Sequence, residues 1–291
     1  MGWALEHESH DIVHGDAVHQ GMQALYKAHA IHGDYNAGYD DAIKAYIKRF
    51  SERFHPDDWW DLGAKSPEGA MLCFREYAAE YHDDAFKLIG SEIYGEVPLE
   101  GSRKLLGKLD LLIEEPDGSI VVVDHKTSKN SITSIAVDEF SSSFQFNTYN
   151  LLGLTYCLSR GIPPERFKGV MVNHLVFKQS AKLGINCEFN RFYVRKTAEQ
   201  LNTFIAEADY IISQIEAETA KLRKLKDINE PLVQFPKNPK NCTAYFRRCE
   251  YYDICHNHPN PLKFARQEPP AGFKISFWDP RGTKEGKKKE L

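Results

Sequence analysis

Two aspartates and a lysine surround a predicted hairpin and could hold a metal ion beside a positive charge. Asp110 lies near the start of the apolar segment LLIEE, and Asp124 and Lys126 follow the apolar segment SIVVVD. In an extended chain the side chains of Asp124 and Lys126 share one face, because the two residues are two apart. Carboxylate oxygens suit Mg²⁺ or Mn²⁺, and the backbone carbonyl of His125 could supply another ligand. The Lys126 ammonium could orient a water or stabilise developing negative charge.

Other polar residues could complete such a site, although each alone is more typical of an ordinary structural role. Gln145 and Tyr149 are four residues apart on a predicted helix, so they share a face and could position the lysine or contact a DNA phosphate. His19, which follows Gly15, could bind a metal through a neutral ring nitrogen. The chain has 12 histidines, however, and D-x-K is a common tripeptide. Only the combination of these residues favours a catalytic site.

The surrounding pattern predicts an α/β fold with a mixed sheet and a helical N-terminal layer. The turn residues at 116–119 join the two hairpin strands. The first helix is expected to begin with Asp16 as its N-cap, which puts His19 in about its first turn. Thr197 and Gln200 form a capping-box pattern at the start of the last long helix. The apolar spacing predicts helices over 11–30, 35–55, 67–88, 141–158 and 197–224, and further strands over 91–100, 168–177 and 185–194.

Composition is that of an ordinary globular protein, with 42% hydrophobic and 27% charged residues in 291. No apolar run has the length of a membrane span, and the N-terminus lacks the apolar core of a signal peptide. We therefore expect a cytoplasmic protein with reduced thiols and no membrane partner. The net charge of -4 neither indicates nor excludes nucleic-acid binding, because a local basic groove is sufficient for it. The expected organisation is a core with its helical layer (1–225), a cysteine-containing segment packed on it (226–265) and a flexible basic tail (266–291).

Four short motifs occur in an order that resembles a known family. They are G-x-x-x-H (Gly15, His19), G-x-x-D (Gly107, Asp110), D-x-K-T (Asp124, Lys126, Thr127) and Q-x-x-x-Y (Gln145, Tyr149). Together they resemble the RecB-like branch of the PD-(D/E)XK nucleases. That branch includes nuclease domains of bacterial helicase–nucleases, CRISPR-associated iron–sulfur nucleases and many phage exonucleases. The chain departs from the family name at Leu109, which stands where other members have proline.

The resemblance implies an αβββαβ core and a metal-dependent DNA nuclease, most simply an exonuclease. It would act on linear single- or double-stranded DNA during recombination, repair or phage DNA processing, in a bacterial cell or a phage-infected host. A recombination or single-strand-annealing partner and a homo-oligomer are compatible with this role. Two alternatives remain open, a catalytically idle DNA-binding or assembly subunit and a different metal-dependent hydrolase. The implied site has metal ligands His19, Asp110, Asp124 and the His125 carbonyl for Mg²⁺ or Mn²⁺, catalytic Lys126, and supporting Gln145 and Tyr149.

Three late cysteines raise the question of a second metal centre. Their spacing, C-x6-C-x5-C, resembles the three C-terminal ligands of the [4Fe–4S] cluster in related nucleases, although the usual first pair is closer. The family's fourth ligand precedes the histidine motif, but no cysteine precedes His19, and Cys73 is expected to lie in the core. An iron–sulfur cluster, a Zn²⁺ ion completed by His256 or His258, and no metal at all therefore remain open. The three residues concerned are Cys242, Cys249 and Cys255.

Overall fold

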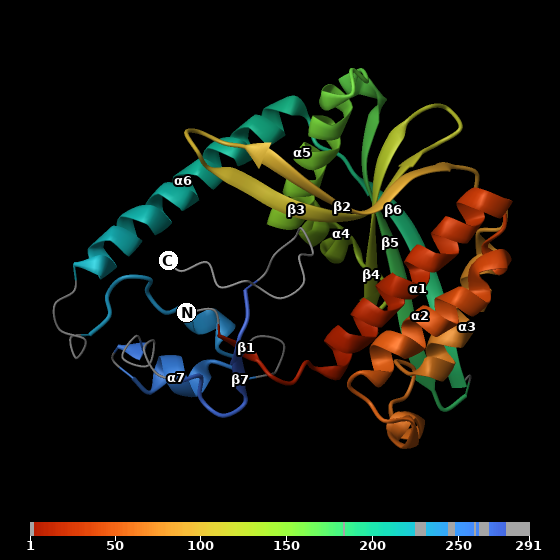
Figure 1. Cartoon of the computed structure of the whole chain (residues 1–291), viewed down its shortest axis with the longest axis horizontal. Helices are drawn as coiled ribbons and strands as arrows, with labels where there is room; N and C mark the ends of the chain where they lie inside the picture. The colour runs from red at the N-terminus through yellow and green to blue at the C-terminus, as the bar shows by residue number, and fades with distance from the viewer. Residues whose placement is uncertain are drawn as a thin grey trace. The chain divides into compact units, whose positions relative to one another are not determined.

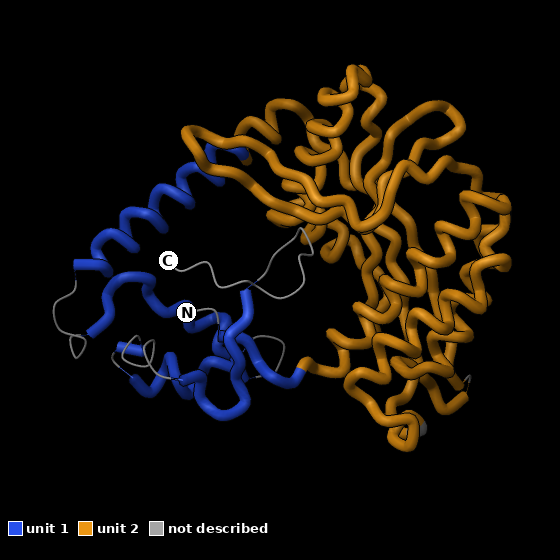
Figure 2. Tube along the Cα trace, viewed as in Figure 1, with its two compact units in different colours: residues 1–7, 205–291 blue, residues 8–204 orange. Residues whose placement is uncertain are grey.

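A computed structural model describes most of the chain, namely residues 3–182, 184–224, 231–243, 248–258, 260–261 and 268–277. The chain forms two compact units, one of residues 8–204 and the other of residues 1–7 with 205–291 (Figure 2). Most of the predicted basic tail, 266–291, lies outside the described residues. The candidate site belongs entirely to residues 8–204, which are unit 2 in Figure 2.

A five-stranded mixed sheet forms the centre of the unit of residues 8–204, in the order β2-β3-β4-β5-β6 (Figure 1). β4 and β5 are parallel, and the other neighbours are antiparallel. The apolar runs of β4 and β5 explain their central position, because a strand covered on both faces needs side chains that can be buried on both. The strands are β2 (Lys87–Pro98), β3 (Lys104–Glu114), β4 (Ile120–Ser128), β5 (Phe167–Ser180) and β6 (Gly184–Val194).

Helices cover both faces of the sheet. α1 (His10–His32), α2 (Tyr39–Ser51) and α3 (Pro67–Glu80) share a core with Leu111 and Val123 of the sheet. The alternate residues of β3 and β4 point the other way, and α5 (Phe144–Ser159) packs against these strands. Taken in chain order, α1, β2–β4, α5 and β5 form the αβββαβ core that the sequence resemblance implied. The predicted fold class is confirmed.

Several helix predictions need correction. The first helix begins at His10 rather than Asp16, because the Ser9 hydroxyl caps it by accepting from Ile12 N. His19 consequently lies in the third turn and not the first. The helix predicted over 67–88 ends at Glu80, and β2 already begins at Lys87.

The helix predicted over 141–158 corresponds to α5, and a separate helix, α4 (Ser134–Ser142), precedes it. Ser143 separates them with extended backbone and caps α5 by accepting from Phe146 N. Thr133 caps the unpredicted α4 in the same way. Both helix starts depend on a single short hydroxyl side chain, which is a weaker signal in the sequence than a row of apolar residues at helical spacing.

The remaining elements are mostly short. The capping box is confirmed at α6 (Ala198–Arg223), where Thr197 N donates to Gln200 Oε1 at 3.0 Å and Gln200 N donates to Thr197 Oγ1 at 3.2 Å. The unit of residues 1–7 and 205–291 contains a two-stranded sheet that was not predicted, β1 (Trp3–Leu5) with β7 (Phe273–Ile275), and α7 (Tyr252–His256). None of the described helices is long and apolar enough to cross a membrane. Short 3₁₀ helices cover Tyr35–Gly38, Pro56–Asp61, Pro164–Arg166 and Pro239–Asn241.

Buried histidines make this fold sensitive to acid. His14 is fully buried, packs edge-on against Phe177 and shares a 2.9 Å hydrogen bond with the Tyr46 hydroxyl. Burial disfavours the charged imidazolium, so it lowers the pKa of His14 well below its ordinary value. Burial lowers the pKa of other histidines in the same direction, namely His10, His29, His125 and His174.

We expect the free energy of unfolding to fall as the pH is lowered from 7 to 5. The pKa of His14 is lower in the folded chain than its unfolded value of about 6.5, so the unfolded chain takes up the proton first. The stabilisation is complete above that value and is lost as pH falls below it, by up to about 1.4 kcal/mol per pH unit. Urea unfolding of His14→Gln should therefore show a shallower pH slope than the parent. The exposed His32→Gln is the control, and equal slopes for His14→Gln and the parent would contradict the argument.

Candidate active site

The candidate site lies where two central strands separate. The β3–β4 ladder ends at the pair Leu111–Val123, so Asp110 and Asp124 are the next residues on the two strands. Beyond this point β3 continues its pairing with β2, and β4 continues with β5 as far as Ser128. The two carboxylates therefore flank a gap in the sheet. In a continued ladder they would have faced each other as a repulsive pair.

Asp110 is held by groups from two other elements. Its Oδ2 accepts a hydrogen bond from the backbone N–H of His125 at 2.9 Å, a donor that the strand separation has freed. The same oxygen lies 3.2 Å from Nδ1 of His19 on α1. Burial alone raises the pKa of Asp110, but His19 and the His125 N–H outweigh it, so that pKa lies well below its ordinary value. Asp110 is thus an anion at neutral pH.

Asp124, Lys126 and two α5 residues form the other half of the site. Lys126 Nζ donates to Asp124 Oδ1 at 3.0 Å and lies over the Phe146 ring, 5.5 Å from its centre. Gln145 Nε2 lies 3.5 Å from the same carboxylate oxygen and donates to the Tyr149 hydroxyl at 2.9 Å. The structure therefore brings the four residues together, and through Asp110 it joins them to His19.

Burial controls the charges in this half. Asp124 is only 1% exposed, and burial raises the pKa of its carboxyl to about 6 although Lys126 opposes that shift. Burial, with the nearby Asp124 charge, also raises the pKa of Tyr149, so its hydroxyl keeps its proton at neutral pH. For His19, burial lowers the pKa, but the Asp110 carboxylate outweighs that effect and raises it. Burial lowers the pKa of His125 to about 3, which keeps its ring neutral.

Comparison with known families identifies the fold to which this site belongs. The family model described as the PD-(D/E)XK nuclease superfamily matches residues 4–256. The chain belongs to this superfamily. Its members are nucleases, and they generally use Mg²⁺ or Mn²⁺.

The solved structures that resemble this chain have low sequence identity to it. A candidate exonuclease from Eubacterium rectale is 13% identical with a TM-score of 0.41, over 72% of this chain and 67% of that one. The structure of SSO0001 is 12% identical with a TM-score of 0.26, over 66% of this chain and 74% of that one. No curated protein matches the chain.

The donor set of this site has the chemistry that the superfamily's metal requires. Two carboxylates and the His125 carbonyl provide hard oxygen ligands. Among the described residues Asp124 Oδ2 is buried and accepts no hydrogen bond, although Lys126 Nζ lies 2.8 Å away as its ion-pair partner. A metal ion could bind this oxygen in place of the ammonium. In the described part of the chain, however, no three His, Cys, Asp or Glu side chains are already arranged around one ion, since His19 is paired directly with Asp110.

The glycines of two superfamily-like motifs have packing roles. A side-chain carbon at Gly107 would stand 2.6 Å from Leu152 Cδ1 of α5, so the leucine would have to move to admit it. A side-chain carbon at Gly15 would stand 3.3 Å from Thr127 Oγ1, because α1 and β4 approach each other closely at this point. These glycines set the distances between the elements that carry the reactive groups.

Replacing Gly107 with valine should destabilise the protein by about 1–3 kcal/mol, because the added atoms overlap Leu152 and must displace it. Urea unfolding measures the change. Leu106→Val is the control, since Leu106 is the neighbouring residue and is 41% exposed. If Gly107→Val and the control have the same unfolding midpoint, the contact between residue 107 and Leu152 does not limit stability.

That the three late cysteines bind a metal remains a prediction. Cys249 N donates to Cys242 O at 2.8 Å, which brings the backbone of these two residues together, and Cys255 lies in α7. All three side chains are partly exposed free thiols. Within the described ranges they do not form a group able to hold a metal, whether with each other or with His256 and His258. Cys73 is fully buried, as predicted.

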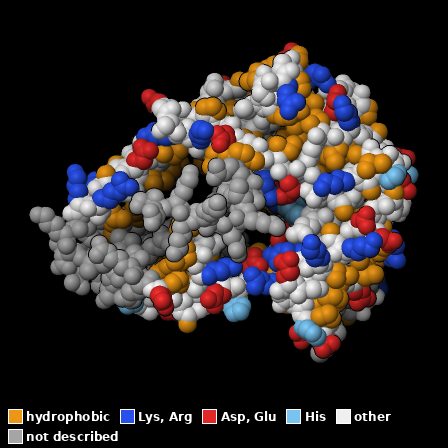
Figure 3. Space-filling model, viewed as in Figure 1, with side chains coloured by type: hydrophobic (Ala, Val, Ile, Leu, Met, Phe, Trp, Pro, Cys, Tyr) orange, Lys and Arg blue, Asp and Glu red, His pale blue; other side chains and the backbone are white. Residues whose placement is uncertain are grey.

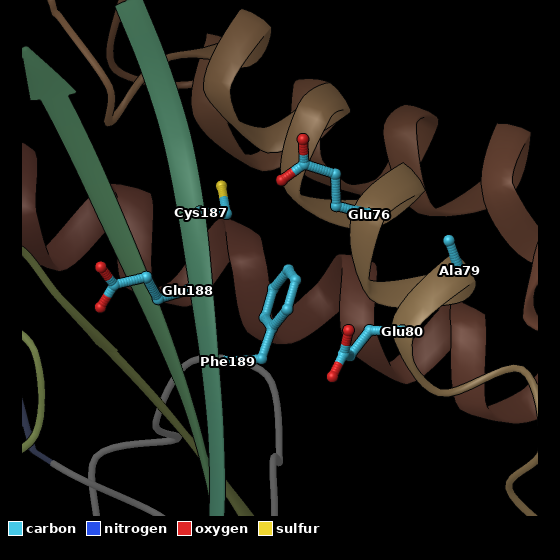
Figure 4. Close-up of a pocket in the computed structure, with 6 residues that line it drawn as sticks. All are labelled: Glu76, Ala79, Glu80, Cys187, Glu188 and Phe189. Carbon is cyan, nitrogen blue, oxygen red and sulfur yellow. The ribbon is translucent and has the colours of Figure 1, made fainter. Parts of the chain in front are cut away.

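A separate hollow lies between α3 and β6 and contains none of the predicted site residues (Figure 4). Three of its six lining residues are glutamates and none is basic, so it does not suit a phosphate backbone. On the face drawn in Figure 3, acidic and basic side chains are interspersed over residues 8–204. The hollow is lined by Glu76, Ala79, Glu80, Cys187, Glu188 and Phe189.

Sequence reasoning missed one buried polar residue that contacts the site. Asn173 stands in the middle of the apolar strand β5 and is paired in register with His125 of β4. Its amide nitrogen lies 2.9 Å from Nδ1 of the His125 ring. A polar residue inside an otherwise apolar run was the available signal, because burying an unpaired amide is costly.

Proposed function

We propose that this protein is a divalent-metal-dependent deoxyribonuclease of the RecB-like branch, acting on linear DNA as an exonuclease. The observation that carries the proposal is the cluster at the strand separation, where Asp110, Asp124 and Lys126 meet Gln145 and Tyr149. Recombination, repair or phage DNA processing is the proposed setting. A recombination or single-strand-annealing protein and further copies of the chain are the proposed partners.

The chain's own residues divide the chemistry between them. A bound Mg²⁺ or Mn²⁺ would polarise the scissile phosphate and lower the pKa of an attacking water. Asp110, Asp124 and the His125 carbonyl would hold the ion, with His19 as a nitrogen ligand once it leaves Asp110. The Lys126 ammonium is placed beside Asp124 to orient the water or to stabilise charge on the phosphate.

The two α5 residues support this arrangement. Tyr149 keeps its proton and can donate to a phosphate oxygen, and Gln145 fixes the position of its hydroxyl. The Gln145 amide also lies 3.5 Å from the Asp124 carboxylate, so it connects helix α5 to that carboxylate on β4. The roles of Gln145 and Tyr149 use contacts that are already formed, because Gln145 lies within hydrogen-bond distance of both Tyr149 and Asp124.

A gel assay with end-labelled DNA tests the proposal. We expect the purified protein to degrade linear DNA only when Mg²⁺ or Mn²⁺ is added, and to leave closed circular DNA intact. Comparing single- and double-stranded substrates, each labelled at either end, would give strand preference and polarity. DNA binding without cleavage under all these conditions would favour the idle-subunit alternative. Turnover of nucleotides or small phosphoesters, with DNA left intact, would favour the other hydrolase.

A further inference from the structure

Asn173 is bonded on both sides although it lies in the core. The residue is 0% exposed, and its amide nitrogen donates to Nδ1 of His125 and to the Tyr77 hydroxyl, both at 2.9 Å. These two bonds use both hydrogens of the amide. The side chain consequently links a residue of the site to the polar group behind it.

The group behind Asn173 is itself held firmly. Arg191 of β6 donates to the Tyr77 hydroxyl at 2.5 Å and, through its other terminal nitrogen, to Asp84 at 2.9 Å. The Tyr77 hydroxyl therefore accepts from Asn173 and Arg191, which leaves its own proton for the Tyr26 hydroxyl, 2.8 Å away. Tyr26 belongs to α1 and Tyr77 to α3, so residues of several elements fix the direction of the Asn173 amide.

The hydrogen-bond polarity determines which nitrogen of the His125 ring carries the proton. With the Asn173 amide nitrogen toward the ring, Nδ1 accepts, which places the proton of the neutral ring on Nε2, a buried nitrogen without a hydrogen-bond partner among the described residues. The ring packs edge-on against that of His19, with centroids 5.8 Å apart, and at a tilt against that of Tyr26, with centroids 5.4 Å apart. Its orientation is thereby set from both sides.

The main chain of His125 belongs to the candidate site. Its N–H donates to Asp110, and the adjacent residues are Asp124 and Lys126. From this geometry we infer that Asn173 is a positioning residue for the nuclease site. It fixes the tautomer and rotation of the His125 ring and, through them, the peptide units that present the carboxylate, the carbonyl and the ammonium. The inference rests on the proposed function and extends it to a residue that touches no substrate.

The test compares Asn173→Leu with Asn150→Leu. Asn150 is a matched control, because it is also a buried asparagine, and it donates to the carbonyls of Phe146 and Val194 rather than to the site. A loss of folded protein lowers the apparent turnover but leaves the half-saturating Mg²⁺ concentration unchanged. A displaced ligand raises that concentration.

For Asn173→Leu we expect the half-saturating Mg²⁺ concentration to rise about tenfold or more, with the KM for DNA unchanged, as is usual when a group that orients metal ligands is removed. The second readout needs no activity. The ¹⁵N shifts of the His125 ring in the metal-free protein should indicate protonated Nε2 in the parent and in Asn150→Leu, and a mixture of tautomers in Asn173→Leu.

An unchanged tautomer together with unchanged Mg²⁺ dependence in Asn173→Leu would overturn the inference. If that variant does not fold, Tyr77→Phe replaces it, since it removes the hydroxyl that orients the Asn173 amide and keeps the ring. The same two shifts, smaller in size, are then expected, and their absence counts equally against the inference. A parent protein without metal-dependent cleavage would refute the proposed function instead, and the ring shifts would still report whether Asn173 sets the tautomer.

Discussion

Replacing Lys126 with methionine is expected to lower DNA cleavage by a factor of about 10³ or more. Lys126 is the cation that contacts the Asp124 carboxylate, and methionine keeps the length of the side chain while removing the charge that would stabilise the transition state. Single-turnover cleavage of end-labelled linear DNA at saturating Mg²⁺ measures the change. Fluorescence anisotropy with the same DNA should show little change in affinity, because one phosphate contact contributes modestly to overall binding.

Lys129→Met provides the matched control for this prediction. Lys129 follows on the same segment, but its side chain is 64% exposed and its nearest carboxylate, that of Asp11, is 4.0 Å away. We expect its cleavage rate to stay within about twofold of the parent, as for a surface charge. Cleavage by Lys126→Met at the rate of Lys129→Met would remove Lys126 from the proposed chemistry.

Replacing Asp124 with asparagine should abolish cleavage and at the same time stabilise the metal-free protein. The carboxylate is 1% exposed, burial raises its pKa to about 6, and Oδ2 lacks a hydrogen bond among the described groups. At pH 7 the folded protein therefore holds a charge that the unfolded chain accommodates more readily. Asparagine has nearly the same shape without that charge, so we expect the free energy of unfolding to rise by about 1–2 kcal/mol.

Two measurements test the expected gain in stability and loss of cleavage. Urea unfolding at pH 7 in a chelator should give a higher midpoint for Asp124→Asn, and cleavage with Mg²⁺ should fall by a factor of about 10³ or more. The stability difference should shrink at pH 5, where Asp124 takes up a proton in the folded state and the charge disappears. The exposed Asp58→Asn controls for the change in net charge. Destabilisation by Asp124→Asn at pH 7 would show that the ion pair with Lys126 outweighs the cost of burial.

Both predictions concern a site whose parts are bonded to each other. His19 is paired with Asp110, and Lys126 with Asp124, so each reactive group has a protein partner. A cation that binds between the carboxylates would compete with His19 and Lys126 for them. Catalytic competence would then depend on how readily these two side chains give up their partners, which is the property that the Mg²⁺ dependence of the Asn173 variants would measure.

Local chemistry in the sequence determined the hairpin and the fold class. The apolar segments on either side of residues 116–119 and the turn chemistry there specify two adjacent strands, and the structure has that turn, with Gly118 N donating to Glu115 O at 2.8 Å. The Thr197–Gln200 capping box is likewise local and was predicted correctly. Apolar runs long enough to be buried on both faces identified the central strands. These features depend on neighbours within a few residues, so a single sequence contains them.

Only the tertiary structure decided how the site is assembled. The separation of β3 from β4 after Leu111–Val123, and the His125 N–H that it frees for Asp110, depend on which strands pair on either side. The link from Asn173 to His125 joins residues that lie 48 positions apart. A glycine in a motif looks the same whether it serves chemistry or packing, and the contact of Gly107 with α5 shows that it serves packing. The types of the reactive residues are written in the sequence, but their charges, partners and distances arise from burial and from contacts between distant segments.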